Sequence, residues 1–160
     1  MKKRNLVLVS LAVVMAMVCG CTEEKVVKAG NNEVVIDSKV YPLESHVMVP
    51  SDSGRHYVDC YEPVGENETP SYRFIADAGA NAIGTSASLP TSEENYYFMF
   101  ERGMENDPQG FSAADFAEGT VSISEDDKAF TYTVDGELAS GEKVSVKVYV
   151  LRSDYDAPAW

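Results

Sequence analysis

Histidine, cysteine and serine are the residue types in this chain that could act as nucleophiles or bind transition metals. His46 and His56 are the only histidines, and neither has another histidine or a cysteine at a metal-ligand spacing. The chain also lacks the Gly-x-Ser-x-Gly element that marks many serine hydrolases. We therefore expect no metal site, no cofactor and no catalytic residue of these classes, and hence a protein that is not an enzyme.

Carboxylates are the other chemically active class, and pairs of them recur along the chain. A glycosidase needs two carboxyl groups held across a cleft. A chain with 26 Asp and Glu residues contains such pairs by chance, so they give little support to a hydrolase. The acidic segment 125–127 lacks the ligand spacing of an EF-hand, so we expect a solvated turn there. The pairs are Glu93/Glu94, Asp126/Asp127 and Asp154/Asp156.

Tyrosines are the residues that most favour a binding function. Tyr57 and Tyr61 lie opposite Val58 and Cys60 on a segment with strand periodicity, and Tyr149 lies opposite a run of valines on another. Exposed tyrosine rings can stack on sugar rings or anchor a protein partner, whereas buried ones belong to the core. Both alternatives stay open for these three tyrosines, which are our candidate ligand-binding residues.

The first 20 residues have the parts of a secretory signal peptide. Residues 2–4 are basic, and residues 6–17 are apolar except for Ser10. This run is shorter than the roughly 20 apolar residues that a membrane-spanning helix needs. Residues 18–21, Val-Cys-Gly-Cys, resemble the bacterial lipobox. An ordinary secretory signal with an incidental cysteine is the weaker alternative, because small residues stand where the processing enzyme requires them.

The lipobox resemblance implies cleavage before Cys21 and acylation of that cysteine with palmitate or similar chains. Each buried methylene contributes about 0.8 kcal/mol, so several acyl chains make membrane attachment effectively permanent. The resemblance therefore implies a lipoprotein of the cell envelope, held at the outer membrane. The acidic run 22–24, Thr-Glu-Glu, resembles the surface-export signal of Bacteroidetes lipoproteins, and a solvated linker explains it equally well.

The charge and the cysteine content of the chain limit its possible partners and the way in which its fold is stabilised. The chain has 13 Lys and Arg, three of them in the signal peptide, so the mature protein has 10 basic and 26 acidic residues, a formal charge of −16. This excludes nucleic acid as a partner, because such binding relies on basic residues that neutralise phosphates. Cys60 is the one cysteine left for the folded domain, and we expect it to be a small buried hydrophobic residue rather than half of a disulfide.

Residues 33–151 alternate with period two almost throughout, which is typical of β-strands. Asp37-Ser38 and Ser140-Gly141 are expected hairpin turns, and Gly136 is expected at a β-bulge. Leu43, Val47 and Val49 are expected on one face of the second strand. The expected strands are 34–36, 39–49, 56–62, 72–76, 96–100, 121–124, 130–138 and 144–150, with one weak edge strand in the loop 78–95 and a further loop at 103–110.

Eight or nine short strands joined by turns predict an all-β fold, an antiparallel β-sandwich, with a small β-barrel as the alternative. At most a short helical turn is expected near 112–118, where residues 112–115 have the pattern of a capping box and Gly119 could end the turn. Segments 119–124, 130–134 and 140–146 resemble the last strands of small uncharacterised Bacteroidetes lipoproteins, and 35–43 resembles their first hairpin, where glycine often replaces Ser38. That resemblance implies a β-sandwich without catalytic residues.

The expected organisation is a signal peptide (1–20), an acylated cysteine and flexible tether (21–32), a β-sandwich domain (33–151) and a C-terminal tail (152–160). The expected function is a lipid-anchored, non-enzymatic extracellular binding or accessory module for a glycan, a peptide or a surface protein. A structural or assembly subunit of an outer-membrane or fimbria-like complex is the alternative. An enzyme with convergent acids in a cleft ranks third.

Overall fold

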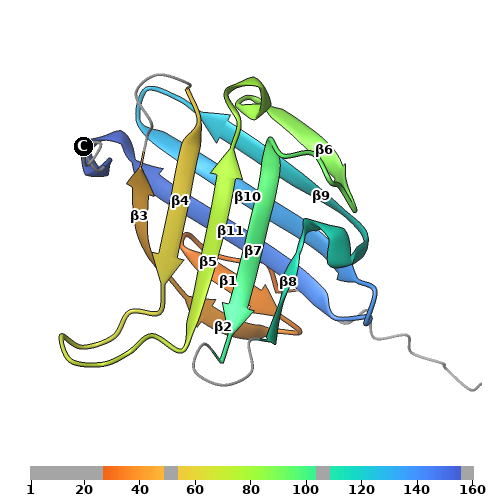
Figure 1. Cartoon of the computed structure of the whole chain (residues 1–160), viewed down its shortest axis with the longest axis horizontal. Helices are drawn as coiled ribbons and strands as arrows, with labels where there is room; N and C mark the ends of the chain where they lie inside the picture. The colour runs from red at the N-terminus through yellow and green to blue at the C-terminus, as the bar shows by residue number, and fades with distance from the viewer. Residues whose placement is uncertain (1–26, 49–53, 104–108, 156–160) are drawn as a thin grey trace, which may run out of the picture.

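The computed structural model describes residues 27–48, 54–103 and 109–155. The expected signal peptide (1–20), Cys21 and the tether as far as residue 26 lie outside the described residues. So do Val49 and the end of the expected tail, residues 156–160. In the part that is described, two antiparallel sheets pack face to face and neither closes into a barrel (Figure 1). The expected all-β sandwich is confirmed, and the barrel alternative is excluded.

The two sheets contain eleven strands in the described residues, and their strands cross obliquely in Figure 1. The six-stranded sheet consists, in spatial order, of β2 (Lys39–Pro42), β1 (Glu33–Ile36), β11 (Lys143–Leu151), β10 (Ala129–Leu138), β9 (Phe116–Glu125) and β6 (Thr85–Leu89). The five-stranded sheet consists of β3 (Glu44–Met48), β4 (His56–Tyr61), β5 (Tyr72–Ala78), β7 (Tyr96–Arg102) and β8 (Gln109–Ser112). Three single 3-10 turns are η1 (Ala80–Ala82), η2 (Ala113–Asp115) and η3 (Arg152–Asp154).

The first hairpin forms as expected. Asp37 and Ser38 occupy its turn with φ of 45° and 69°, and Val35 stands opposite Val40. The expected single strand beyond it is wrong. β2 ends at Pro42, Leu43 turns into the core, and β3 pairs with β4 in the other sheet. Proline cannot donate to a strand ladder, so Pro42 suits the point where the chain leaves one sheet for the other.

Residues 109 and 110, the end of the expected loop 103–110, form the start of strand β8, and residues 104–108 of that loop lie outside the described residues. Strand β8 pairs with β7, and its Phe111 is buried. With one large apolar side chain among Gln, Gly and Ser, the segment carries almost no strand pattern of its own. The weak edge strand expected within 78–95 is present as β6, at the edge of the six-stranded sheet.

The core lies between the two sheets, and both sheets contribute aromatic and aliphatic side chains to it. Phe74, Phe98 and Phe100 of the five-stranded sheet are fully buried, as is Cys60, as expected. They face the inward valines of β11 and the inward residues of β10. Tyr132 of β10 is also fully buried, and its hydroxyl donates to the carbonyl of Tyr96 across the sandwich at 3.1 Å. Burial raises the pKa of this hydroxyl, so it stays a donor.

Strands β9, β10 and β11 form the expected meander, with its turn at Ser140-Gly141. The expected bulge lies next to Gly136 rather than at it, because the register shifts between Glu137 and Leu138. Gly136 instead stands directly opposite Gly119. A Cβ at position 136 would lie 2.4 Å from the carbonyl oxygen of Glu118, so this close approach of two backbones requires glycine.

The helical turn near 112–118 is present, but it is shorter than expected. Ser112 and Asp115 form the expected capping box around the single turn η2. Gly119 does not end this turn, because β9 already begins at Phe116. Phe116 is buried, and its packing in the core starts the strand there.

Residues 28–32, expected to be the end of a flexible tether, lie on the outer face of the six-stranded sheet. Lys28 pairs with Asp135 at 2.6 Å, and the Ala29 amide donates to Ser145 Oγ at 3.0 Å. The Tyr149 amide donates to Asn32 Oδ1 at 2.7 Å. Seven residues separate Cys21 from Lys28, and a fully extended chain of that length spans at most roughly 23 Å, at ~3.3 Å each.

Candidate functional site

The three candidate tyrosines do not lie together. Tyr57 and Tyr61 are half-buried on the outer face of the five-stranded sheet, because they alternate with the inward Val58 and Cys60 on β4. Tyr149 lies on the outer face of the six-stranded sheet, on the other side of the molecule. Tyr57 and Tyr61 can therefore contribute to one surface, and Tyr149 cannot join it.

A third tyrosine joins Tyr57 and Tyr61 on this surface. Tyr57 stands opposite Asp77 on β5, which stands opposite Tyr97 on β7. Two strand spacings separate Tyr57 from Tyr97, or roughly 10 Å. Tyr97 is the most exposed of the three rings, at 44%. We call Tyr57, Tyr61 and Tyr97, with Ile75 and Met99 between them, the tyrosine face.

Sequence reasoning missed Tyr97, although a signal was present. The segment 96–100 is apolar on both faces, which by itself predicts a central strand buried on both sides. The strand is indeed interior, since β7 pairs with both β5 and β8, but only one of its faces is in the core. Once Phe98 is assigned to the core, period-two alternation places Tyr97 outward.

Two ion pairs hold the polar side chains of this surface between the tyrosines. Arg55 binds Asp77 with two hydrogen bonds, Nε to Oδ1 at 3.0 Å and Nη2 to Oδ2 at 2.8 Å. Arg73 pairs with Glu101 in the row that contains Tyr61. The carboxylates raise the pKa of both guanidinium groups. Both pairs are partly exposed, so they order the surface more than they stabilise the fold.

Asp59 lies between Tyr57 and Tyr61 on β4, within the tyrosine face. The Tyr61 hydroxyl donates to Asp59 Oδ2 at 2.8 Å, and this hydrogen bond is the main reason that the pKa of Tyr61 is raised. Burial is the main reason that the pKa of Tyr57 is raised. Asp59 Oδ1 is buried and has no hydrogen-bond partner among the described residues. Both tyrosines thus stay neutral at physiological pH, which suits stacking and hydrogen-bond donation rather than base chemistry.

A small pocket adjoins the most exposed of the tyrosines. It has a volume of about 210 Å³ and is mostly apolar. Tyr97 forms one wall, Thr91 and Glu93 of the loop before β7 form another, and Ala113 and Ala114 of η2 form a third. The pocket is large enough for one small ring or one side chain of a ligand, with the Tyr97 ring as a stacking surface.

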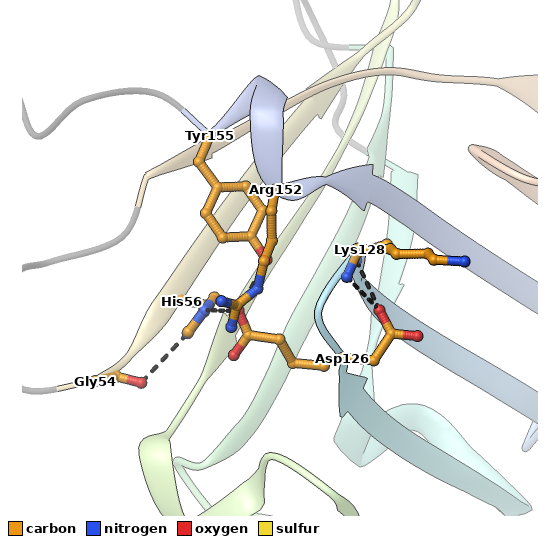
Figure 2. A network of polar contacts seen from close by, with 8 residues as sticks. Gly54, His56, Asp126, Lys128, Arg152 and Tyr155 are labelled. Carbon is orange, nitrogen blue, oxygen red and sulfur yellow. Dashed lines mark hydrogen bonds and ion pairs between the residues drawn. The ribbon is translucent and has the colours of Figure 1, made fainter.

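A buried polar network lies at another part of the sandwich and involves one of the two histidines. His56 is only 5% exposed and stacks on Phe130 with ring centroids 5.0 Å apart. Its Nε2 lies 3.2 Å from Glu125 Oε1, which also accepts from Tyr155 Oη at 3.0 Å and Arg152 Nη2 at 2.8 Å. Figure 2 shows the side chains of Arg152, Tyr155 and His56 close together. The network docks the start of the expected C-terminal tail onto β4 and β9.

This network contains a histidine and a carboxylate, which are the residue types of acid–base chemistry, and the contacts of its carboxylate are those of a structural network. Burial raises the pKa of Glu125, but the interactions with Tyr155, His56 and Arg152 outweigh it, so the pKa is lowered. The contacts of Glu125 Oε1 are with His56 of β4 and with Arg152 and Tyr155 of the tail, so the carboxylate joins the tail to the sandwich. We assign the network to the stability of the fold.

Two of the carboxylate pairs, Asp126/Asp127 and Glu93/Glu94, lie in different environments. Asp126 is exposed and its Oδ1 accepts from the amides of Lys128 and Ala129, which confirms the expected solvated turn. Glu93 and Glu94 line the pocket beside Tyr97. Within residues 27–48, 54–103 and 109–155, no three His, Cys, Asp or Glu side chains gather as a metal site would require.

The described residues include no helix that is long and apolar enough to span a membrane. No protein-family model, curated protein or solved structure matches this chain.

Proposed function

We propose that this protein is a lipid-anchored, non-enzymatic binding module of the cell envelope, and that its tyrosine face recognises an extracellular glycan. The observation that carries the proposal is the gathering of Tyr57, Tyr61 and Tyr97 on one outer face, with Tyr97 44% exposed beside a pocket of about 210 Å³. Peptide and protein ligands are the competing outcomes of the binding test below.

Tyrosine side chains suit such a surface for a physical reason. Each ring offers a large apolar area with few rotatable bonds, and each hydroxyl can hydrogen-bond to a sugar or a backbone group. Asp77, held by Arg55, lies between Tyr57 and Tyr97 and limits the directions in which polar groups can approach. A ligand with both a flat apolar side and hydroxyl groups, such as a sugar ring, matches this combination.

The position of the N-terminal segment supports a surface that faces away from the membrane. Residues 28–32 are attached to the outer face of the six-stranded sheet through Asp135 and Ser145. The tyrosine face lies on the opposite side of the sandwich. With a tether of roughly 23 Å from an acylated Cys21, the six-stranded sheet would be the nearer one to the lipid.

The anchoring part of the proposal is tested by labelling cells that express the full chain with an alkyne analogue of palmitate. We expect label on the wild-type chain and its recovery in the membrane fraction. Cys21→Ser should abolish both, because the acyl chains have no other attachment point in the proposal. Label that persists in Cys21→Ser, or a wild-type chain that stays unlabelled, would contradict lipidation at Cys21.

The binding part is tested on a glycan array and by pull-down from cell-surface extracts. The protein used is the chain from residue 22 onward, since every described element and the single core lie within residues 27–155. We expect specific glycans to bind the wild type and to be lost with Tyr57→Ala/Tyr97→Ala. Tyr149→Ala is the matched control, because it removes a tyrosine from the opposite face. Silence on the array, or equal loss in both variants, would refute the proposal, and a peptide or protein ligand in the pull-down would replace the glycan.

A second candidate function, an assembly subunit of an outer-membrane complex, is favoured by strand β6. This strand is at the edge of the six-stranded sheet, and Thr85, Ser86, Ala87 and Ser88 carry no charge that would discourage pairing with another chain. Co-purification from membranes separates the two functions. A stoichiometric partner that is lost when Ser86 is replaced by lysine would favour assembly, and a monomer without partners would favour the binding module.

A further inference from the structure

An inward-pointing arginine at one end of the sandwich is the strongest unexplained feature of the described residues. Along β7, Phe98 and Phe100 point into the core, and Arg102 continues the same series at the end of the strand. It stands opposite Tyr72 of β5. A guanidinium in this position is costly unless it has a charged or hydrogen-bonding partner.

The partners of Arg102 set it apart from the other arginines in the described part of the chain. Arg55, Arg73 and Arg152 each form an ion pair with a carboxylate. Arg102 forms no ion pair with a described residue. Its Nη1 donates to the hydroxyl of Tyr41 at 3.2 Å, and its Nε is buried without a hydrogen-bond partner. In a protein with a formal mature charge of −16, a cation without such a pairing among the described residues is unusual.

A second cation shares the same phenol ring. Lys39 Nζ lies 4.8 Å from the centroid of the Tyr41 ring, and the guanidinium carbon of Arg102 lies 5.9 Å from it. Burial raises the pKa of the Tyr41 hydroxyl, but the two cations outweigh burial and the pKa is lowered. The direction of this shift shows a positive potential at the Tyr41 oxygen.

These cations border a pocket of about 380 Å³ between β2 and the adjoining ends of β5, β7 and β8. Tyr41 and Tyr72 pack edge to face beneath it, with ring centroids 5.3 Å apart. Ser71 and Gln109 add a hydroxyl and an amide to its rim. The Ser71 hydroxyl donates to Glu62 at 2.6 Å, so a carboxylate lies behind this part of the rim.

We infer that this pocket binds the carboxylate of an acidic sugar, with Arg102 and Lys39 as its charge partners and the rim as its hydroxyl-binding side. A guanidinium offers the planar fork that matches a carboxylate. Arg102 lines the pocket and has five N–H donors, and the one side-chain hydrogen bond that the structure gives it among the described residues is from Nη1 to Tyr41. The volume accommodates a sugar ring, and the hydroxyl and amide at the rim match ring hydroxyls. This site is separate from the tyrosine face, and its test does not depend on whether the tyrosine face binds a glycan.

The test is a titration of the isotope-labelled chain from residue 22 onward, followed by the amide NMR signals of Gly103 and Ser71. The probes are sodium glucuronate, glucose as the neutral match, and sodium acetate as the anion without a ring, at constant ionic strength. We expect glucuronate to bind at least tenfold more tightly than either of the others. Lys39→Gln and Arg102→Gln should each weaken glucuronate binding about tenfold. Lys128→Gln, an exposed cation in the distant β9–β10 turn, should leave it unchanged.

Each other outcome would overturn the inference. Equal binding of glucose would remove the role of the charge, and equal binding of acetate would remove the role of the sugar ring. Unchanged affinity in Lys39→Gln would remove the pocket as the site even if Arg102→Gln failed to fold, because Lys39 is exposed and its replacement leaves the core intact. An equal loss in Lys128→Gln would show general attraction between charges rather than a site.

Discussion

Replacing Glu125 with glutamine should destabilise the protein by about 2 kcal/mol. The Glu125 side chain is only 13% exposed, and its Oε1 interacts with Tyr155, Arg152 and His56 at 2.8–3.2 Å. Glutamine keeps the shape and can still accept one hydrogen bond, but it removes the charge. A hydrogen bond to a charged group contributes about 1.5–3 kcal/mol. Arg152 is half exposed, so its share is at most about 1 kcal/mol.

The assay is urea unfolding of the chain from residue 22 onward at several pH values. For a domain of this size, a loss of about 2 kcal/mol corresponds to a fall of roughly 8 °C in the melting temperature. Arg152→Gln is the matched control, and it should cost less than Glu125→Gln because it leaves the Tyr155 and His56 contacts in place.

The stability difference between the wild type and Glu125→Gln should change with pH in a definite direction. The folded protein lowers the pKa of Glu125, so its contribution is present above the unfolded pKa and is lost as pH falls through the folded value. An unperturbed glutamate has a pKa near ~4.3, so the difference between wild type and Glu125→Gln should shrink below about pH 4. A variant within about 0.5 kcal/mol of the wild type at pH 7 would refute the reasoning, and so would a difference that grows as pH falls.

Three further predictions concern the scaffold. Ser38→Gly should raise the free energy of unfolding by about 1 kcal/mol, because Ser38 has a φ of 69° that glycine adopts without strain; a lower unfolding midpoint in urea would contradict this. Gly136→Ala should cost about 2–3 kcal/mol, because its Cβ would lie 2.4 Å from the Glu118 carbonyl oxygen; an unchanged melting temperature would show that the β9–β10 ladder yields easily. Tyr132→Phe should cost about 1 kcal/mol in urea unfolding, because it removes the hydrogen bond to Tyr96; a neutral result would mean that the bond across the sandwich adds nothing.

Much of the fold follows from local sequence pattern. Period-two alternation placed the inward valines of β11 and the inward face of β10 correctly, and Asp37-Ser38 and Ser140-Gly141 marked real turns. The pattern failed where alternation runs on through a change of sheet, as it does at Leu43. It also failed at β8, where Phe111 is the single large apolar residue and pairing with β7 decides the structure.

The candidate sites were less accessible to sequence reasoning, because tertiary placement creates them. Alternation put Tyr57 outward, but which tyrosines share a face depends on which sheet each strand joins, and this separates Tyr149 from the rest. The contact of Arg102 with Tyr41 spans 61 positions in the sequence and has no local signal. The attachment of residues 28–32 to β11 relies on hydrogen bonds with the Ser145 hydroxyl and the Tyr149 amide, which leave no hydrophobic pattern.

The most direct test of the proposed function is the affinity of the tyrosine face for its best array ligand. It is measured by calorimetry for the wild type, Tyr97→Ala and Tyr149→Ala. Tyr97 is 44% exposed, so its replacement should leave the melting temperature nearly unchanged. We predict that Tyr97→Ala weakens binding at least tenfold and that Tyr149→Ala binds like the wild type. Wild-type affinity in Tyr97→Ala would contradict the claim that this face is where the protein meets its ligand.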